Sequence, residues 1–540
     1  MPSPLGAVQE PQRLHPLTLL LRVGASLPAL VIILLPTLQN PSSENVVSVV
    51  LGILYGVVAL PTIVLQYLRF SYRITPKQIV IQKGVLNRKN RSIPIERVQN
   101  IQVEQNLVAR LFGMAKVKIE TAGSAATEGA LEYVGLEAAH EIRRVVRSFQ
   151  REDVDAADAA DETEAPTGEL LFAMSLPRVM LSGAFRFSLF YLVLIFSALE
   201  LIDPELIVER VLRSQGRVDQ ITDLMAAHPA IAILGSIAGA VVLGWISGIL
   251  IHVSRYYGFR LRLDDDKLHK RHGLFTVTED TVPLKKVQAL ILRTNPLMRA
   301  FGWYGLQVQT VGTDVDEQGH RVIAPFAQYD AILQLAQRVR TFDLPDRFQS
   351  VSPLTIRRRF FRYSVVLGLV LVPVGYFWPA TWWHLGDVAL PWWGLALLPG
   401  LLGWAVLQYR NHGYARQDDG LYVRRGVLSR HLWILPTEKF HVFAATASLF
   451  QRRLGLKTLY VDTAGAASSA YPEIVDLPAA EADTQLNGLY NRFHSLYRDR
   501  IADATGAADT RLSPHERPRL PAEHTDTTPQ SPPTPPSDET

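Results

Sequence analysis

One pattern of glycine and proline occurs three times in this chain of 540 residues, each time with the same spacing. In each copy a Gly is followed by a Pro 10 residues later, by a second Gly after 19 more and by a third Gly after another 10. Gly and Pro adopt backbone conformations that other residues adopt poorly, so the recurrence predicts the same turns in the same order. We therefore expect one small domain used three times. The positions that define the repeat are Gly84, Pro94, Gly113, Gly123, Gly273, Pro283, Gly302, Gly312, Gly426, Pro436, Gly455 and Gly465.

Six apolar stretches precede the repeats in pairs. Each approaches the roughly 20 residues that a helix needs to cross the hydrocarbon core of a bilayer. A hydrophobic content of 48% agrees with a chain that lies partly in lipid. We expect six transmembrane helices in three pairs, with the first retained rather than cleaved as a signal peptide. The stretches are residues 17–36, 46–66, 181–202, 230–251, 363–379 and 388–408.

The distribution of Lys and Arg predicts the orientation of the spans. The short connections 39–45 and 380–387 contain neither residue, whereas the opposite ends of the spans are rich in Arg. Basic residues near span ends favour the cytoplasmic side. We therefore expect a multi-pass protein of the bacterial plasma membrane with both termini and all three repeats in the cytoplasm. Arg22 and Arg186 lie inside expected spans, and we expect them to reach the headgroups; the alternative is an intramembrane charge site.

Each repeat contains short β-branched or alternating segments separated by turn residues, which is typical of strands. Asn106, Asn295 and Ser448 can each cap a short helix that the second Gly of the repeat would end. A longer helical segment closes each repeat. The fold class we expect is mixed, membrane α plus soluble β, with each helix pair followed by an antiparallel barrel that a C-terminal helix caps.

This reading divides the chain into nine parts. We expect a cytoplasmic N-terminus at 1–16, helix pairs at 17–66, 181–251 and 363–408, repeated domains at 68–150, 256–342 and 412–497, an acidic flexible linker at 151–176 and a disordered Pro-rich tail at 502–540.

The first repeat contains the segment YRITPKQIVIQKGVLNRKNRSIPIERVQNIQVEQNLVARLFGMAKVKIETAG. Along its whole length it resembles the bacterial pleckstrin-homology-like domain of the YdbS/YdbT-type membrane proteins, long catalogued as a domain of unknown function. Three such domains behind helix pairs resemble the longer YdbT-like architecture. The corresponding stretch of the third repeat, LPTEKFHVFAATASLFQRRLG, lacks the Arg-Val-Gln of residues 97–99. The resemblance implies a pleckstrin-homology-like (PH-like) barrel, but brings no established catalytic residues and no agreed ligand.

Basic residues gather in the first half of each repeat. In eukaryotic pleckstrin-homology domains the first hairpins hold phosphoinositide headgroups, so we expect contact with anionic lipid headgroups; the alternative is a strand edge that Lys and Arg protect against aggregation. The residues are Lys83, Arg88, Lys89, Arg91, Lys267, Lys270, Arg271, Arg424, Arg425 and Arg430.

The sequence predicts no catalytic, cofactor-binding or metal site. We find none of the common hydrolase, phosphate-loop, zinc-protease or dinucleotide motifs, and the absence of Cys excludes thiol chemistry. A net charge of +4 is too small to argue for nucleic acid. We therefore expect a non-catalytic, membrane-tethered binding or scaffolding protein with protein partners of unknown identity, acting in envelope maintenance or protection. The alternatives are a transporter or channel subunit and an enzyme of lipid metabolism.

Overall fold

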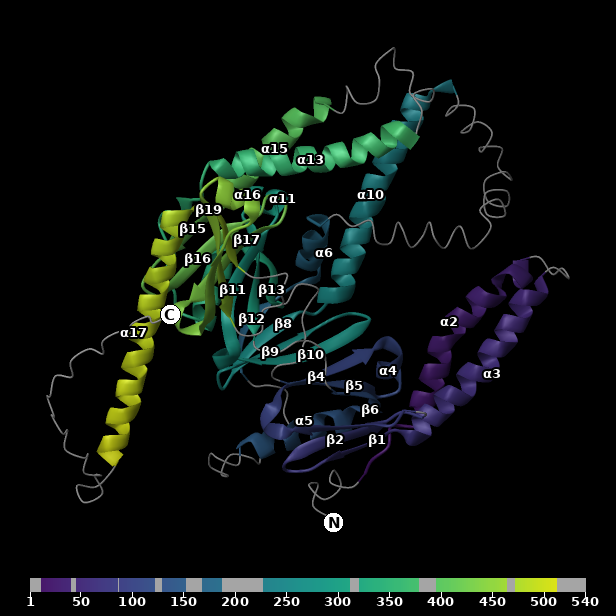
Figure 1. The fold of residues 1–540 in the computed structure, drawn as a ribbon. Helices are drawn as coiled ribbons and strands as arrows, with labels where there is room; N and C mark the ends of the chain where they lie inside the picture. Colours follow the sequence, from purple (N-terminus) through teal and green to yellow (C-terminus); the bar gives the residue numbers. More distant parts are fainter. Residues whose placement is uncertain are drawn as a thin grey trace, which may run out of the picture. The chain divides into compact units, whose positions relative to one another are not determined.

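A computed structural model describes residues 11–39, 45–85, 87–121, 129–151, 168–186, 227–310, 320–377, 395–463 and 472–511. The chain divides into two compact units, Met1–Leu486 and Asn487–Thr540. Along the chain, the same succession of elements occurs three times: four strands, a helix of five residues, two more strands and a closing helix (Figure 1).

The first repeat comprises β1 (Ser71–Ile74), β2 (Gln78–Lys83), β3 (Lys89–Pro94), β4 (Val98–Asn106), α4 (Leu107–Leu111), β5 (Met114–Thr121), β6 (Gly129–Gly135) and α5 (Leu136–Arg151). The second comprises β8 (Arg260–Asp264), β9 (Lys267–His272), β10 (Thr276–Pro283), β11 (Val287–Thr294), α11 (Pro296–Ala300), β12 (Trp303–Thr310), β13 (Arg321–Gln328) and α12 (Tyr329–Val339). The third comprises β15 (Gly413–Arg416), β16 (Gly420–Arg425), β17 (Arg430–Pro436), β18 (Phe440–Thr446), α16 (Leu449–Arg453), β19 (Leu456–Thr463), β20 (Glu473–Pro478) and α17 (Ala479–Arg511).

The described members of the glycine ladder have the backbone conformation that the spacing predicts. Gly84, Gly273 and Gly426 lie at φ of 107°, 117° and 106°, and the second glycine of each repeat also has a positive φ. The expected caps form as well, because the side chains of Asn106, Asn295 and Ser448 accept hydrogen bonds from backbone N–H groups at the start of α4, α11 and α16. Gly123, Gly312 and Gly465 lie outside the described residues.

The sheets join neighbouring repeats. Strands β4 to β6 of the first repeat continue into β10, β9 and β8 of the second, and β11 to β13 of the second continue into β17, β16 and β15 of the third. At each junction the fourth strand of one repeat pairs with the third strand of the next, antiparallel. Two short strands, β7 (Glu169–Ala173) and β14 (Gln349–Ser350), extend the far edges of these seven-stranded sheets.

The expected closed barrels are not found among the described strands. Each repeat splits its strands between two sheets, and the edge that would close a barrel is occupied by the neighbouring repeat. The two sheets of a repeat still enclose one core. Ile79 and Ile93 of the first sheet and Val117 and Ile119 of the second belong to one buried cluster. Open sheets that share strands across a junction satisfy the same edge hydrogen bonds as closure does.

The closing helices of the first two repeats pack on these cores. Ile142 and Val146 of α5 lie in the core of the first repeat. Ile332 and Leu335 of α12 lie in the core of the second. We expected a helix that caps a closed barrel; in these two repeats the helix instead packs on an open pair of sheets.

Three described helices are long and apolar enough to span a membrane: residues Leu17–Leu38 within α2 (Leu17–Gln39), all of α3 (Val46–Arg69) and all of α10 (Pro229–Tyr256). The expected spans 181–202 and 388–408 lie partly outside the described residues. Residues 363–377 of the expected span 363–379 belong to α13 (Leu354–Phe377), which begins with several arginines, and residues 378–379 lie outside the described residues. Six transmembrane helices are thus not shown, and three candidate spans are found among the described residues.

Two further expectations need correction. The linker expected at 151–176 contains β7, which pairs with β8 because its ELLFA sequence offers apolar side chains to an open sheet edge. The tail expected to be disordered from residue 502 continues as α17 to Arg511, in a stretch rich in Ala, the residue with the highest helix propensity. Residues 512–540 lie outside the described part.

Candidate anion-binding site

Two helices beside the second repeat pack closely at glycines. Helix α6 (Leu176–Ala184) packs against α10 through Gly183 and Gly248. A Cβ on Gly248 would lie 1.9 Å from the carbonyl oxygen of Arg186, and one on Gly183 would lie 2.5 Å from the Cα of Ile249. The buried Ser182 hydroxyl also lies 3.1 Å from Nδ1 of His252. The contact fixes the chain after α6 beside the end of α10.

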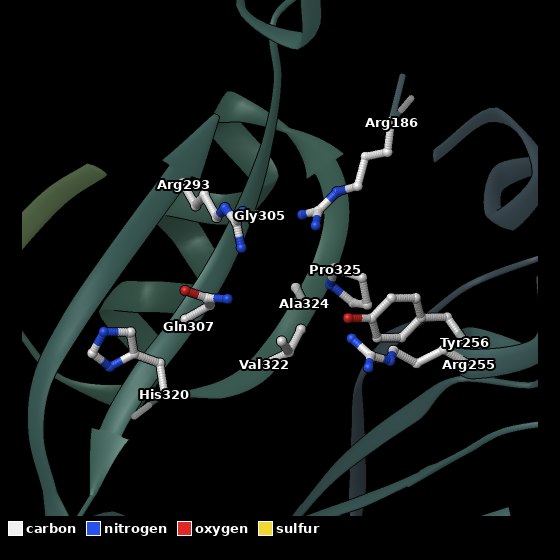
Figure 2. Close-up of a pocket in the computed structure, with 10 residues that line it drawn as sticks. All are labelled: Arg186, Arg255, Tyr256, Arg293, Gly305, Gln307, His320, Val322, Ala324 and Pro325. Atoms are coloured by element: carbon white, nitrogen blue, oxygen red, sulfur yellow. The ribbon is translucent and has the colours of Figure 1, made fainter. Parts of the chain in front are cut away.

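This packing brings together arginines that are far apart in the sequence. Arg186 follows α6, Arg255 lies in the last turn of α10, and Arg293 lies on β11. All three line a cavity of about 120 Å³ whose remaining walls come from Tyr256, β12, β13 and His320 (Figure 2). Figure 2 shows the guanidinium ends of Arg186 and Arg293 pointing toward one another across the cavity. We call it the arginine cavity.

The arginine cavity is electropositive. Its ten described lining residues include three arginines and one histidine but neither Asp nor Glu. The charge also affects a neighbouring group, since the pKa of His431 is lowered to about 4, first by burial and then by Arg293 and His320. Guanidinium groups present planar forks of N–H donors that match phosphate and carboxylate oxygens. The arrangement therefore suits an anion.

A buried acceptor completes the wall. Gln307 on β12 is 7% exposed, and its Oε1 atom is buried with no hydrogen-bond partner among the described residues. A buried acceptor without a partner costs about 1–3 kcal/mol. Water has a share of about 30 Å³ in the liquid, so the cavity has room for about four waters or a group of similar size. An oxyanion that also carries a hydroxyl group would satisfy both the arginines and Gln307.

A second cavity, of about 370 Å³, lies at the junction between the first and second repeats and has a different character. It is lined by both signs of charge, and these are paired: Lys118 lies 2.7 Å from Glu104, and Lys270 lies 3.7 Å from Asp280. Four basic residues, Lys118, Arg255, Lys270 and Arg321, face two carboxylates, Glu104 and Asp280, which offset the positive charge in part, whereas the described lining of the arginine cavity includes no carboxylate.

The basic residues expected to contact lipid occupy varied places. Lys83, Arg88, Lys89 and Arg91 of the first repeat are all exposed. Lys270, in contrast, is 8% exposed and faces Asp280, so it belongs to the junction rather than to a lipid-facing surface. The remaining five residues lie on β9, β16 and β17, partly buried or exposed, and Arg425 pairs with Glu473 at 2.9 Å; they are Lys267, Arg271, Arg424, Arg425 and Arg430.

The structure gives specific contacts for the two arginines inside expected spans, and their expected contact with headgroups stays a prediction. Arg22 of α2 forms an ion pair of 2.8 Å with Glu132 on β6, so it contacts the first repeat. Arg186 lines the arginine cavity. Sequence reasoning singled out Arg186 and counted the arginines at the span ends, but it grouped neither Arg255 nor Arg293 with Arg186. The closely spaced glycines of the fourth expected span were the available signal, because they indicate close helix packing; Gly248 has this role, whereas no described atom lies near Gly235 or Gly239.

The fold and the cavity together define a helix-anchored membrane protein built from three sheet-and-helix repeats. Residues 22–150, 229–341 and 364–492 match the family described as Bacterial PH domain, and the chain belongs to this family. It is similar to the UPF0699 transmembrane protein YdbT of Bacillus subtilis (strain 168), with 23% identity over 496 residues that cover 88% of this chain and 97% of the relative. No solved structure matches the chain.

Proposed function

We propose that this chain is a non-catalytic, membrane-tethered binding protein that holds a phosphate-bearing headgroup of an anionic lipid in the arginine cavity. The observation that carries the proposal is the convergence of Arg186, Arg255 and Arg293 on one small cavity at the end of a membrane-spanning helix. A hydrogen bond to a charged group contributes about 1.5–3 kcal/mol, so three arginines supply specificity that a diffuse basic surface lacks. The Oε1 of Gln307, which has no hydrogen-bond partner in the described part of the chain, favours a headgroup with hydroxyl groups, such as a glycerol phosphate.

The location of the cavity supports a lipid rather than a free metabolite. Arg255 lies in the last turn of α10, which is long and apolar enough to span the bilayer. Such a helix end stands at the depth of the headgroups. A headgroup can therefore enter while its acyl chains remain in the membrane.

The membrane topology remains part of the proposal. We propose a multi-pass protein of the plasma membrane with cytoplasmic termini and repeats, on the basis of the Lys and Arg asymmetry across the spans. A cysteine at Asn40 should react with an impermeant maleimide in intact cells, and one at Lys77 only after lysis. The native chain contains no Cys, so the labelling has no background. The reverse pattern would invert the topology.

The two other functional classes make different demands. A transporter or channel subunit needs ionisable or polar groups at mid-membrane. In the described α2, α3 and α10, the Arg residues instead lie near the ends that face the repeats. A lipid-metabolising enzyme needs a carboxylate or histidine beside the reacting group, and the lining of the arginine cavity includes His320. Prolonged incubation with glycerophospholipids, followed by mass spectrometry of the lipids, tests this alternative; unchanged lipids agree with binding alone.

The binding test uses the full chain in a neutral detergent with three probes: dioctanoyl phosphatidylglycerol, dioctanoyl phosphatidylcholine and inorganic phosphate. We expect the anionic lipid to raise the melting temperature in a saturable manner and the neutral lipid to have no such effect. A ligand at 100 times its Kd stabilises a protein by about 2.7 kcal/mol. Stabilisation by phosphate equal to that by the anionic lipid would identify a soluble phosphate as the ligand instead.

Matched variants assign the effect to the cavity. Arg186→Gln and Arg293→Gln should each weaken binding of the anionic lipid about tenfold to hundredfold, since 1.4 kcal/mol is a factor of ten. Arg347→Gln removes an exposed arginine away from the cavity and should leave the affinity unchanged. Equal binding by all three variants would exclude the arginine cavity as the site.

A second, weaker contact with the bilayer is proposed for the exposed basic residues of the first repeat, Lys83, Arg88, Lys89 and, in a chain whose β3 edge is unpaired, Arg91. A basic residue near an anionic leaflet contributes about 1 kcal/mol, and the contact is screened once the Debye length falls from about 10 Å at 0.1 M salt to about 3 Å at 1 M. The salt dependence separates this surface from the cavity, whose partly enclosed charges are screened less.

A further inference from the structure

The two junctions between repeats have the same strand register. At the first, Val277 pairs with Gln105, six residues before Pro283 and one before the helix cap Asn106. At the second, Arg430 pairs with Thr294, six residues before Pro436 and one before the cap Asn295. At both junctions, therefore, the third strand of one repeat pairs with the fourth strand of the preceding repeat in the same register, although the side chains at the two junctions differ.

One third strand and one fourth strand take part in neither junction. Strand β3, the third strand of the first repeat, lies at the edge of a three-stranded sheet, and β18, the fourth strand of the last repeat, lies at the edge of another. Within the described residues neither edge pairs with a further strand. Residues 89–92 of β3 are exposed, whereas the centres of β10 and β17 are largely buried. An open edge is a template for strand addition, and these two edges are complementary by their position in the repeat.

We propose that chains associate head to tail, with β18 of one copy pairing antiparallel with β3 of a second copy. The occupant of each edge is thus a second copy of this chain. Continuing the register of the two internal junctions pairs Asn90 with Ala445, Arg91 with Ala444 and Ser92 with Phe443 of the neighbouring copy. The result continues the row of repeats from one molecule to the next.

The side chains at this third junction fit one another. Arg91 occupies the position of Asp280, which at the first junction accepts a hydrogen bond of 2.6 Å from Asn100 on the neighbouring strand β4. Opposite Arg91 stands Ala444, and its neighbours on β19 are Tyr460 and Asp462, because Ala444 pairs with Tyr460 and Val442 with Asp462. The small Ala444 leaves space for the long arginine side chain to cross β18. Asp462 and the Tyr460 ring then offer it an ion pair and a cation–π contact.

The symmetry of the contact agrees with membrane anchoring. Two different strands meet, so the interface is heterologous and extends into a ring or an open row. Every copy in such a row uses the same two edges, so each additional membrane-anchored chain joins the row in the same way. A symmetric pairing of β3 with β3 would not repeat either internal junction.

The first experiment uses charge reversal in the full chain, followed by mass photometry in detergent over a range of concentrations. The wild type should form dimers and larger species as concentration rises. Arg91→Asp alone places a second carboxylate against Asp462, and Asp462→Arg alone places two arginines together. Each should weaken self-association at least tenfold, because like charges across an interface are unfavourable. Arg347→Asp and Asp346→Arg, at exposed sites outside both edge strands, serve as charge-matched controls and should associate as the wild type does.

An equimolar mixture of the two reversed variants is the decisive sample. In a row that alternates the two variants every contact joins opposite charges, because the introduced carboxylate meets the introduced arginine at one contact and native Arg91 meets native Asp462 at the next. Association of the mixture should therefore return toward the level of the wild type at the step from monomer to dimer. Recovery also demonstrates that both variants are folded. Failure of the mixture to dimerise, or association of each single variant as strong as that of the wild type, would overturn the proposal.

Cysteine pairs test the register in native membranes. Asn90→Cys mixed with Ala445→Cys should give a disulfide-linked dimer on mild oxidation, while Asn90→Cys mixed with Ala444→Cys should not, since a shift of one residue places the side chain on the opposite face of the sheet. The native chain has no Cys that could interfere. Equal cross-linking of both pairs, or a dimer from Asn90→Cys alone, would contradict the proposed pairing.

Discussion

Arg321 of β13 donates to both carboxylate oxygens of Asp280 on β10, at 2.7 Å each, and also bonds to Glu120 on β5 of the first repeat. The three residues are at most 6% exposed. Burial alone would raise the pKa of Asp280, but Arg321 and Lys270 outweigh it and hold this pKa below its usual range. One buried ionic group therefore ties the first repeat to the second.

Breaking this group should be costly. Arg321→Met leaves two buried carboxylates with little compensation, and we expect a loss of about 3–5 kcal/mol in the free energy of unfolding, measured by denaturant titration in detergent. The triple variant Arg321→Met, Asp280→Asn, Glu120→Gln should recover part of the loss. The exposed pair Arg338–Glu169 is the comparison, and Arg338→Met should cost at most about 1 kcal/mol. Equal losses for Arg321→Met and Arg338→Met would contradict this account.

The glycines of the repeat should differ in their sensitivity to alanine. At Gly84 a Cβ would lie 2.0 Å from the carbonyl oxygen of Asn87, and φ is 107°. At Gly113 φ is 63°, but nothing described lies within 4 Å of a Cβ. A left-handed conformation costs a residue with a Cβ about 1–2 kcal/mol. We expect Gly113→Ala to lower stability by about that amount and Gly84→Ala by more, and thermal melts of the two variants provide the comparison.

The contact between α6 and α10 should control the arginine cavity from a distance. Gly248→Ala places a Cβ against the carbonyl oxygen of Arg186 and should both lower the melting temperature and weaken binding of dioctanoyl phosphatidylglycerol. Gly239→Ala on the same helix meets no described atom within 4 Å and serves as the control. Unchanged lipid binding by Gly248→Ala would separate the helix contact from the site.

Stability should fall under mildly acidic conditions. The pKa of His431 is lowered to about 4 and that of His412 to about 3, in both cases first by burial and then by neighbouring arginines or histidine. Unfolded histidine titrates near 6.5. Between these values the unfolded chain binds more protons than the folded chain, so the stability present above pH 6.5 is lost as the pH falls toward 4.

His431 alone should contribute at most about 3 kcal/mol to this loss, since one pKa unit corresponds to about 1.36 kcal/mol. Melting temperatures measured from pH 8 to pH 4 should therefore decline less steeply in His431→Gln than in the wild type. A parallel decline in both would show that His431 is protonated in the folded protein at the same pH as in the unfolded chain.

The repeat and its local geometry could be predicted from the sequence. The positive φ of Gly84 and Gly273 and the caps at Asn106 and Ser448 depend on residues within a few positions, and the sequence pattern states them directly. The first two long apolar helices, α2 and α3, were also predictable, because each lies in a continuous apolar stretch of about the length that a membrane helix needs. Lys270 shows the limit of such reasoning, because its sequence neighbours are those of a surface hairpin while its burial comes from Asp280 and the adjoining repeat.

Only the tertiary structure decided how the repeats join and where the arginines meet. Strand β4 pairs with β10 across about 170 residues, and a strand pattern alone does not say which edge it will meet, because backbone N–H and C=O groups are the same on every edge. Arg186 and Arg293 likewise become neighbours because Gly183 and Gly248 have no side chains, so that α6 and α10 can pack closely. This packing places Arg186 at the cavity that Arg293 of β11 also lines. The sequence determined the local conformations of this protein, and the long-range packing of edges and helices determined its sites.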